Sequence, residues 1–211
     1  MKKKGPTKTE TALLDPFPAL ALAQIVVPRT ADEFAAAAAE ILAAGAAGFD
    51  TEARPTFKVG EVSDGPHLVQ FAIADKAGAG KAFLFQVHRS EGHEALVALL
   101  KSPALLKAGF GLHSDRGQIQ ARLGVQPAAL LDLDIVFRKD GYSGDMGVRA
   151  AVGLVLCQRF HKSKQVTTSN WGLRELSPPQ LLYAANDAYA AFMVLQGLRA
   201  TRPALLAAVG V

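Results

Sequence analysis

The sequence predicts an α/β layer fold around a mixed β-sheet, and two patterns support this prediction. The first is a group of three short apolar runs rich in strand-forming residues, over residues 47–53, 67–74 and 82–87. Clusters of Gly, Pro and Asp separate these runs, which is typical of adjacent strands joined by hairpins. The second is a change of period after residue 90, where helical and strand-like segments alternate. Hairpin strands followed by such an alternation predict a sheet with both parallel and antiparallel pairs.

The individual elements follow from local signals. Thr30 followed by Glu33 is a capping-box signature, and the alanine-rich helix that it begins is expected to run to about Ala44, where Gly45 ends it. The alternating part is expected to contain a helix over 91–100, a strand over 105–112, a helix over 115–123 and a strand over 129–136. After these, the apolar spacing is helical over 148–156 and over 180–198, with a polar loop between them.

Composition and charge limit the class of protein. A chain of 211 residues, half of them apolar and a fifth charged, has the size of one domain with one core. No run of eighteen or more apolar residues is present that could cross a bilayer, and no membrane partner is expected. Four lysines and one glutamate in the first ten residues account for +3 of the net charge of +4, so residues 1–12 are expected to be a disordered basic tail before a domain over 13–211. The single Cys157 cannot form an internal disulfide, which makes a reducing cytoplasm the simplest compartment.

Asp50 and Glu52 are the first candidate site residues. They stand two apart in a predicted strand, so the pleat places both side chains on the same face. Two neighbouring carboxylates repel each other, and after the apolar Gly48 and Phe49 such a pair is costly to bury unless a cation holds it. The alternative is that both side chains face solvent at the end of a strand. Further carboxylates are needed to decide between these interpretations.

Asp115, Tyr183 and Asp187 extend this set. Asp115 follows an apolar strand at the predicted strand-to-helix turn, a position where sheet proteins commonly bind ligands. It could instead cap the next helix, a role that Ser114 could serve equally. Tyr183 and Asp187 are four apart in a strongly helical stretch and therefore lie on one helix face. Their neighbours are mostly apolar, which indicates that this helix is buried and that Asp187 needs a partner.

Three segments that contain these residues resemble the three ordered motifs of the DEDD superfamily of 3′-to-5′ exonucleases. They are GFDTEARPTF around Asp50, AGFGLHSDRGQI around Asp115 and LSPPQLLYAANDAYAAF around Asp187. Exonuclease domains of the Werner-helicase type and their stand-alone bacterial relatives are the most similar subgroup, and RNase D is more distant. The stretch KSKQVTTSNW, which ends at Trp171, resembles the same subgroup. The resemblance covers nearly the whole chain after residue 12 and implies a ribonuclease-H-like fold, with helices on both faces of a mixed sheet.

The third motif distinguishes two branches of this superfamily, which carry either a tyrosine four residues before the aspartate or a histidine five residues before it. This chain has Tyr183 at the first position and a leucine at the second, so it resembles the tyrosine branch. The resemblance implies two Mg²⁺ or Mn²⁺ ions per site, in agreement with a purely oxygen-based ligand set. Asp50 would bridge the ions, Glu52 and Asp187 would complete the site of the ion that activates water, and Asp115 would hold the second ion through a water molecule. Tyr183 would orient the attacking water.

The implied substrate is a nucleic acid with a free 3′ end, single-stranded or recessed duplex DNA in the first place, from which nucleoside monophosphates are released. The candidate substrate contacts are Thr51, Phe57, His113 and Lys164. Phe57 could equally belong to the core, His113 to a structural turn, and Lys164 to the solvated surface. Other basic residues that could line the path of the strand are Arg54, Lys58, Arg116 and Lys162.

Two rival functions stay open at this point. An RNase D-like 3′ exoribonuclease would act on a phosphodiester that RNA and DNA share, so the motifs do not separate the two substrates. A catalytically inactive nucleic-acid-binding module would keep the fold without the reaction. Such modules usually lose an acidic ligand, whereas this chain keeps all four carboxylates and the tyrosine.

Overall fold

The computed structural model describes residues 2–56, 63–75 and 78–211, and a six-stranded mixed sheet forms the centre of this part of the chain. In spatial order the strands are β2 (Ile25–Val26), β5 (Gly80–Gln86), β4 (Leu68–Ala74), β3 (Ala46–Glu52), β6 (Leu106–Gly109) and β7 (Leu130–Asp132). β3, β4 and β5 form an antiparallel meander. β6 lies parallel to β3, β7 parallel to β6, and β2 parallel to β5. The predicted mixed sheet with three early hairpin strands is therefore confirmed.

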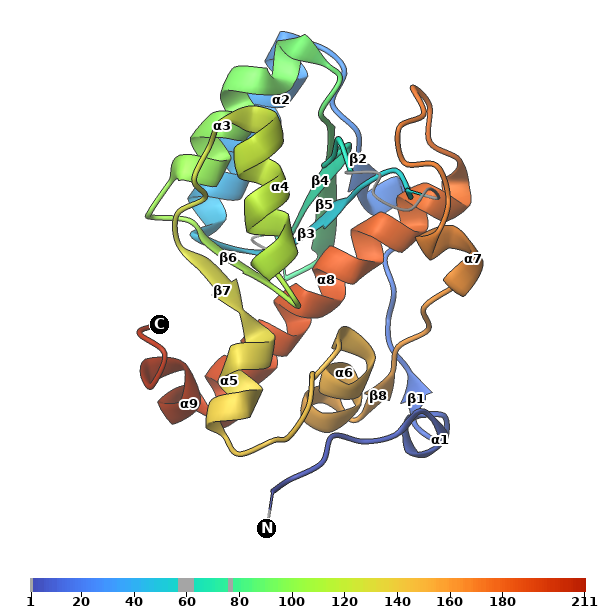
Figure 1. Cartoon of the computed structure of the whole chain (residues 1–211), viewed down its shortest axis with the longest axis vertical. Coiled ribbons are helices and arrows are strands. Elements are labelled where there is room, and N and C mark those ends of the chain that lie inside the picture. Colours follow the sequence, from blue (N-terminus) through green and yellow to red (C-terminus); the bar gives the residue numbers. More distant parts are fainter. Residues whose placement is uncertain (1, 57–62, 76–77) are drawn as a thin grey trace.

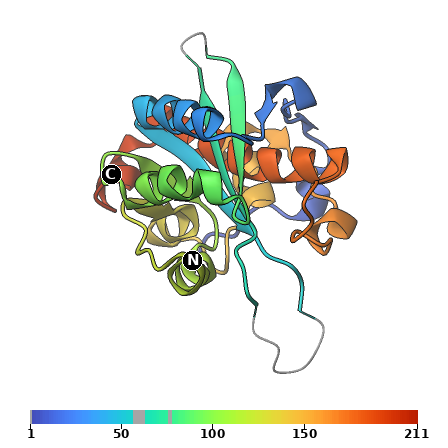
Figure 2. The same ribbon diagram turned by 90° about the horizontal axis from the view of Figure 1, so that it is seen from above.

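Helices cover both faces of this sheet (Figures 1 and 2). On one face lie α2 (Ala31–Ala44), α3 (His93–Lys101) and α4 (His113–Leu123), and on the other the long α8 (Pro178–Thr201) crosses β3, β4 and β5. The remaining helices are α1 (Lys8–Thr11), α5 (Leu133–Lys139), α6 (Val148–Leu156), α7 (Lys164–Thr167) and α9 (Pro203–Ala207), with the 3₁₀ turns η1 (Leu22–Gln24) and η2 (Ser90–Gly92). A separate parallel pair is formed by β1 (Asp15–Pro16) and β8 (Gln158–Arg159). The predicted α/β architecture is confirmed.

Each face of the sheet buries its own hydrophobic cluster. On the α2 side the rings of Phe34, Phe85, Phe71 and Phe49 follow one another, with centroids 5.5, 5.7 and 5.4 Å apart. These rings come from one helix and three strands, so their packing joins α2 to the sheet. On the opposite side α8 is buried along most of its length, because its apolar residues extend around the helix instead of forming one stripe.

β3 and α8 come into unusually close contact at Gly48. A Cβ atom at this position would lie 1.9 Å from the carbonyl oxygen of Ala188 and 2.7 Å from the backbone nitrogen of Phe192. Only a residue without a side chain permits such an approach. Gly48 stands two residues before Asp50, and Ala188 directly follows Asp187. The contact therefore sets the distance between the acidic residues of the two elements.

One expected strand is largely a helix. The pattern over residues 129–136 predicts a strand, but only β7 pairs with β6, and the chain then enters α5. Asp132 causes this change, because its carboxylate accepts a hydrogen bond from the backbone N–H of Asp134 at 3.1 Å and so caps α5. The same carboxylate accepts from the N–H groups of Gly111 and Leu112 at 3.1 and 3.0 Å. A short apolar run does not by itself distinguish a buried strand from a buried helix.

Residues 2–12 of the basic N-terminal segment, for which we expected a disordered tail, lie against other parts of the chain in the structure. Lys3 forms an ion pair with Asp140 at 2.8 Å, and Thr11 is only 1% exposed. Arg159 donates a hydrogen bond to the carbonyl of Ala12 at 3.0 Å. Figure 1 shows the segment passing along α6 towards the β1 and β8 pair. Composition does not reveal such contacts with residues distant in sequence.

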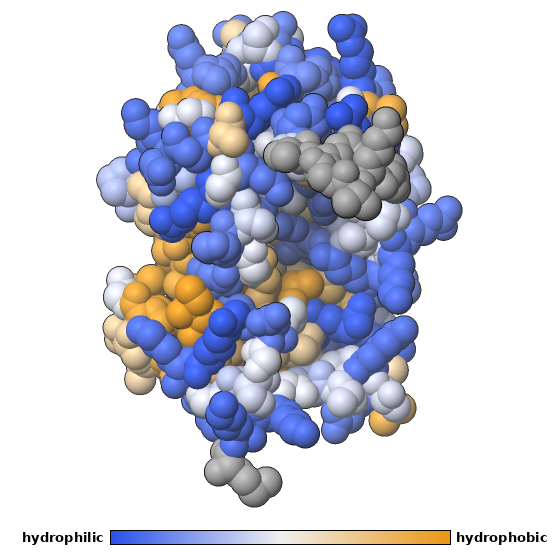
Figure 3. All heavy atoms as spheres, viewed as in Figure 1, coloured by the Kyte–Doolittle hydropathy of each residue, from blue (hydrophilic) through white to orange (hydrophobic). Residues whose placement is uncertain are grey.

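The face of the molecule seen in Figure 3 is mainly polar. Figure 3 shows hydrophilic residues over most of one face, with apolar residues gathered where α5 and α9 lie in Figure 1. Ile135 of α5 is 48% exposed and Val211 is 42% exposed. Single exposed apolar residues are ordinary on a globular protein. Among the residues described, no helix combines the length and the apolar character needed to span a bilayer.

Candidate active site

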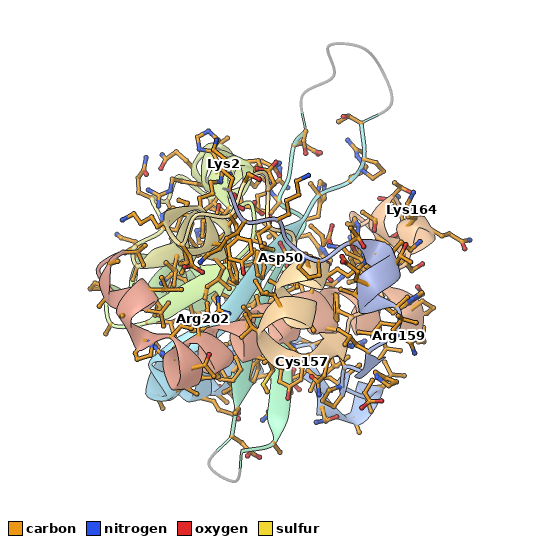
Figure 4. All side chains as sticks on the ribbon, turned by 90° about the horizontal axis from the view of Figure 1, so that it is seen from below. Lys2, Asp50, Cys157, Arg159, Lys164 and Arg202 are labelled. Carbon is orange, nitrogen blue, oxygen red and sulfur yellow. The ribbon has the colours of Figure 1, made fainter. Side chains whose placement is uncertain are left out.

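Three carboxylates from two elements meet between β3 and α8. Asp50 and Glu52 alternate with Thr51 along β3, so both side chains project from the face that α8 covers. Asp187 comes from the middle of α8. Carboxylate oxygens of the three residues lie within 4.8 Å of one another, and Figure 4 shows Asp50 near the centre of the molecule. The structure thus brings together three of the four carboxylates that the sequence singled out.

These carboxyl groups are poorly solvated and close to like charges. Burial, with Asp187 and Asp115 nearby, raises the pKa of Asp50 well above its usual range. Burial and the charge of Asp50 raise the pKa of Glu52 to about 9. Burial also raises the pKa of Asp187. Three acids in this arrangement are costly to ionise unless a cation neutralises them. Their oxygen-only ligand set fits Mg²⁺ or Mn²⁺ better than zinc.

Asp115 lies beside this cluster, in the first turn of α4. Its carboxylate accepts a hydrogen bond of 2.5 Å from the hydroxyl of Thr51, which stands between Asp50 and Glu52 on β3. Asp115 also contributes to the raised pKa of Asp50, so the two carboxyl groups interact through space. The helix cap is neither Asp115 nor Ser114, because the N-cap residue of α4 is Leu112. The alternative interpretation of Asp115 as a helix cap is therefore wrong.

Tyr183 lies one helical turn before Asp187. Its hydroxyl shares a hydrogen bond of 2.8 Å with the hydroxyl of Thr167, and its ring packs against Trp171 with the centroids 5.8 Å apart. Burial and the nearby Asp187 raise the pKa of Tyr183 to about 12. The phenol therefore stays protonated at neutral pH. A protonated hydroxyl at this place can donate a hydrogen bond to a water molecule or accept one from it.

Lys162 reaches the cluster from the loop between β8 and α7. Its ammonium nitrogen lies 2.5 Å from Oδ2 of Asp187 and 5.2 Å from the centroid of the Tyr183 ring. Burial opposes the charge of this ammonium, but the attraction of Asp187 and Asp50 raises the pKa of Lys162 overall. The sequence had placed Lys162 only among basic residues along the path of the strand. Its contact with Asp187 joins two segments far apart in the chain, and no periodic pattern could have shown it.

The proposed substrate contacts lie in different surroundings. A hollow of about 530 Å³ opens beside the carboxylates and is lined by Asp50, Asp187, Lys162 and the exposed His113. Lys164, at the start of α7, lines a smaller neighbouring hollow together with Lys162. Figure 4 shows Lys164 and Arg159 at the same side of the molecule.

Of the other two candidate contacts, Thr51 does not line either hollow. The hydroxyl of Thr51 is engaged by Asp115, so its evident role is to hold that carboxylate. Phe57 lies outside the described residues. His113 and Lys164 are thus the two candidates whose exposed side chains face hollows near the carboxylates.

Two curated relatives share sequence with most of this chain. The bifunctional 3′-5′ exonuclease/ATP-dependent helicase WRN of Mus musculus is 29% identical over 153 residues, which are 72% of this chain and 11% of that protein. A 3′-5′ exonuclease of Arabidopsis thaliana is 27% identical over 153 residues, which are 72% of this chain and 52% of that protein. The chain therefore spans about half the length of one of these relatives and a small part of the other.

The fold and a family profile agree with these relatives. The structure of Trypanosoma brucei RNase D in complex with RNA U12 has a TM-score of 0.72 at 22% identity, covering 84% of this chain and 63% of that chain. This likeness concerns the fold, and it agrees with the ribonuclease-H-like architecture that the motifs imply. The profile of the family described as 3′-5′ exonuclease matches residues 25–201, a range that includes all four carboxylates and Tyr183. This chain therefore belongs to the 3′-5′ exonuclease family of hydrolases.

Proposed function

We propose that this chain removes nucleotides one at a time from the 3′ end of DNA, as a metal-dependent exonuclease of the DEDD tyrosine branch. The observation that carries this proposal is the meeting of Asp50, Glu52 and Asp187 within 4.8 Å. Tyr183 lies one turn before Asp187 on the same helix, as the tyrosine branch requires. Membership of the 3′-5′ exonuclease family supplies the polarity of the reaction.

The cofactors that we propose are two Mg²⁺ or Mn²⁺ ions held by Asp50, Glu52, Asp187 and Asp115. Such ions stabilise the charge that develops on the phosphate and on the leaving oxygen, and they lower the pKa of a bound water. The protein contributes oxygen ligands from three elements, namely β3, α8 and α4. Thr51 fixes the orientation of Asp115 through its hydrogen bond. Neutralisation by cations also removes the cost of placing these carboxylates side by side.

We assign to Tyr183 the role of positioning the attacking water. Thr167 restrains its hydroxyl from one side, and the raised pKa keeps the hydroxyl proton in place. The hydroxyl would therefore orient the attacking water by a hydrogen bond while keeping its own proton. We assign substrate positioning to the exposed His113 and Lys164, because both side chains line hollows close to the carboxylates.

RNA is the second candidate substrate. One observation favours it, namely the likeness of the fold to T. brucei RNase D in complex with RNA U12. The resemblance of the motifs to the Werner-helicase type favours DNA, and the carboxylates act on a bond that both polymers share.

The domain bounds and the location in the cell are proposals as well. We propose a single exonuclease domain over residues 13–211, with residues 2–12 folded against it. A cytoplasmic location agrees with the lone Cys157, an exposed free thiol at the end of α6.

The test is digestion of 5′-labelled single-stranded DNA, recessed duplex DNA and RNA in parallel, with Mg²⁺ or Mn²⁺. We expect a descending ladder of labelled products from DNA, and no digestion after exhaustive chelation. Asp187→Asn should abolish the ladder, whereas Asp32→Asn, at an exposed position in the first turn of α2, should leave it unchanged. Full activity after chelation would exclude the two-metal proposal. Immediate release of labelled mononucleotide would contradict the polarity, and faster digestion of RNA would make RNA the substrate.

A further inference from the structure

Lys162 stands at the boundary between the acidic cluster and the hollow beside it. Its ammonium nitrogen is 2.5 Å from Oδ2 of Asp187, and the same side chain lines the hollow that Asp50 borders. The side chain of Lys162 is 31% exposed, whereas that of Asp187 is 4% exposed. Lys162 therefore pairs with a buried acid while its own side chain remains partly exposed to solvent.

The contact differs from an ordinary surface ion pair. Surface pairs are solvated on both sides and contribute little, but here the acid is buried and next to two further carboxylates. Apart from this ion pair, Oδ2 of Asp187 has no hydrogen-bond partner among the described residues. The ammonium also lies over the ring of Tyr183, 5.2 Å from its centroid, a distance at which the ring attracts a cation. Lys162 thus supplies a positive charge where the cluster needs one.

A divalent cation that binds Asp187 needs the place beside Oδ2 that the ammonium of Lys162 occupies. Mg²⁺ binds carboxylate oxygens at roughly 2.0–2.1 Å, so an ion on Oδ2 would lie within a few ångströms of the ammonium. Two cations at that distance repel each other strongly in a poorly solvated site. The ammonium also occupies the oxygen that has no other partner in the described part of the chain. Binding of the ion and the contact between Lys162 and Asp187 therefore oppose each other.

We propose that Lys162 is a built-in competitor of the metal, which neutralises Asp187 and moves into the adjacent hollow when a divalent ion binds. The competition lowers the affinity of the site for the ion and keeps the ion exchangeable. This inference rests on the proposed function in one respect, namely that a divalent ion binds at Asp187. It adds a residue that regulates metal affinity without serving as a ligand.

The test is a titration of the whole chain with Mn²⁺ alone, without nucleic acid, followed by calorimetry or by the electron paramagnetic resonance of free Mn²⁺. Lys162→Met keeps the length of the side chain and removes the charge, and it should tighten Mn²⁺ binding about tenfold or more. Lys162→Arg keeps the charge and should bind Mn²⁺ like the wild type. Lys164→Met removes an exposed lysine in the next helix and should also leave the affinity unchanged.

A second measurement uses only the wild-type chain and so does not depend on how the variants fold. The rate of acetylation of each lysine by an amine-reactive ester is followed by mass spectrometry with and without Mn²⁺. Mn²⁺ should accelerate modification of Lys162 severalfold, because the displaced ammonium leaves its buried partner, while the rate at Lys164 should stay constant. An equal rate at Lys162 in both conditions would overturn the proposal.

The outcomes separate this proposal from the proposed function. If the wild type binds Mn²⁺ and Lys162→Met binds it equally or more weakly, competition is excluded while the metal site stands. If neither protein binds Mn²⁺, both the proposed metal site and the proposed competition by Lys162 are contradicted. Tighter binding by Lys164→Met as well would show a general charge effect and would also overturn the specific role of Lys162.

Discussion

At the scale of single residues, the ring and the hydroxyl of Tyr183 have separate partners. The ring packs against Trp171, and the hydroxyl bonds to Thr167. Tyr183→Phe keeps the ring, so stability should fall by only about 1 kcal/mol, the scale of one lost hydrogen bond. If the hydroxyl orients the attacking water, turnover should fall by roughly ten- to a thousandfold. Single-turnover digestion and thermal unfolding measure the two effects separately.

The matched control is Tyr189→Phe on the same helix. Tyr189 is buried to the same degree as Tyr183, but its ring lies against Phe17, 5.7 Å away between centroids. This variant should keep wild-type turnover. Asp187→Asn should fail in another way, by weakening Mn²⁺ binding, because it removes a charged ligand. Wild-type turnover of Tyr183→Phe together with a loss of stability would make the tyrosine a packing residue only.

At the scale of elements, the contact between β3 and α8 decides whether the carboxylates meet. Gly48→Ala would place a Cβ atom 1.9 Å from the carbonyl oxygen of Ala188, so the helix must move away from the strand. We expect a loss of about 2–4 kcal/mol in the free energy of unfolding. Mn²⁺ affinity should fall as well, because Asp187 moves with α8. Urea unfolding followed by circular dichroism and a Mn²⁺ titration measure these changes.

Gly117→Ala is the control for this substitution. Gly117 lies within α4, and a Cβ atom added there would have no heavy atom of another element within 4 Å, so the methyl group meets open space. Alanine is the better helix former, and the variant should gain about 0.5–1 kcal/mol in stability. Equal stability of Gly48→Ala and the wild type would contradict the close contact between strand and helix.

At the scale of the whole molecule, the buried Asp187 and the half-buried Asp50 and Glu52 connect the stability of the domain to pH. The pKa of Glu52 is raised from 4.5 to about 9, and those of Asp50 and Asp187 are raised as well. Between pH 4.5 and about pH 9, Glu52 therefore keeps its proton in the native state, whereas the same carboxyl group has lost it in the unfolded chain. The contribution of these groups to stability is therefore fully present below their ordinary pKa and is lost as the pH rises towards 9.

The measurement is the unfolding temperature in a chelator between pH 5 and pH 9. The unfolding temperature should fall across this range. Glu52→Gln should make this fall smaller, because it removes the group with the raised pKa. Glu94→Gln, at an exposed position of α3, should leave the fall unchanged. Saturating Mn²⁺ should raise the unfolding temperature, and more so at pH 8 than at pH 6, because metal binding releases protons. A stability that rises with pH in the chelator would contradict the raised pKa values.

Much of the fold and of the site could be predicted from neighbouring residues. The capping pair Thr30 and Glu33, the shared face of Asp50 and Glu52, and the shared helix face of Tyr183 and Asp187 each depend on a separation of a few residues. Strand and helix periods are properties of the backbone, so these separations determine which side chains share a face before any tertiary contact exists. The sequence by itself therefore determined the mixed sheet, the long helix that carries Tyr183 and Asp187, and the identity of the candidate acidic residues.

The tertiary structure alone decided how these parts meet. Gly48 sets the distance between β3 and α8, Thr51 ties down Asp115, and Lys162 reaches Asp187 from a distant loop. Asp132 turned an expected strand into α5 by accepting backbone hydrogen bonds from two separate segments. Contacts of this kind join residues far apart in the chain, and they leave no period or local signature, because nothing in the intervening sequence is constrained by them.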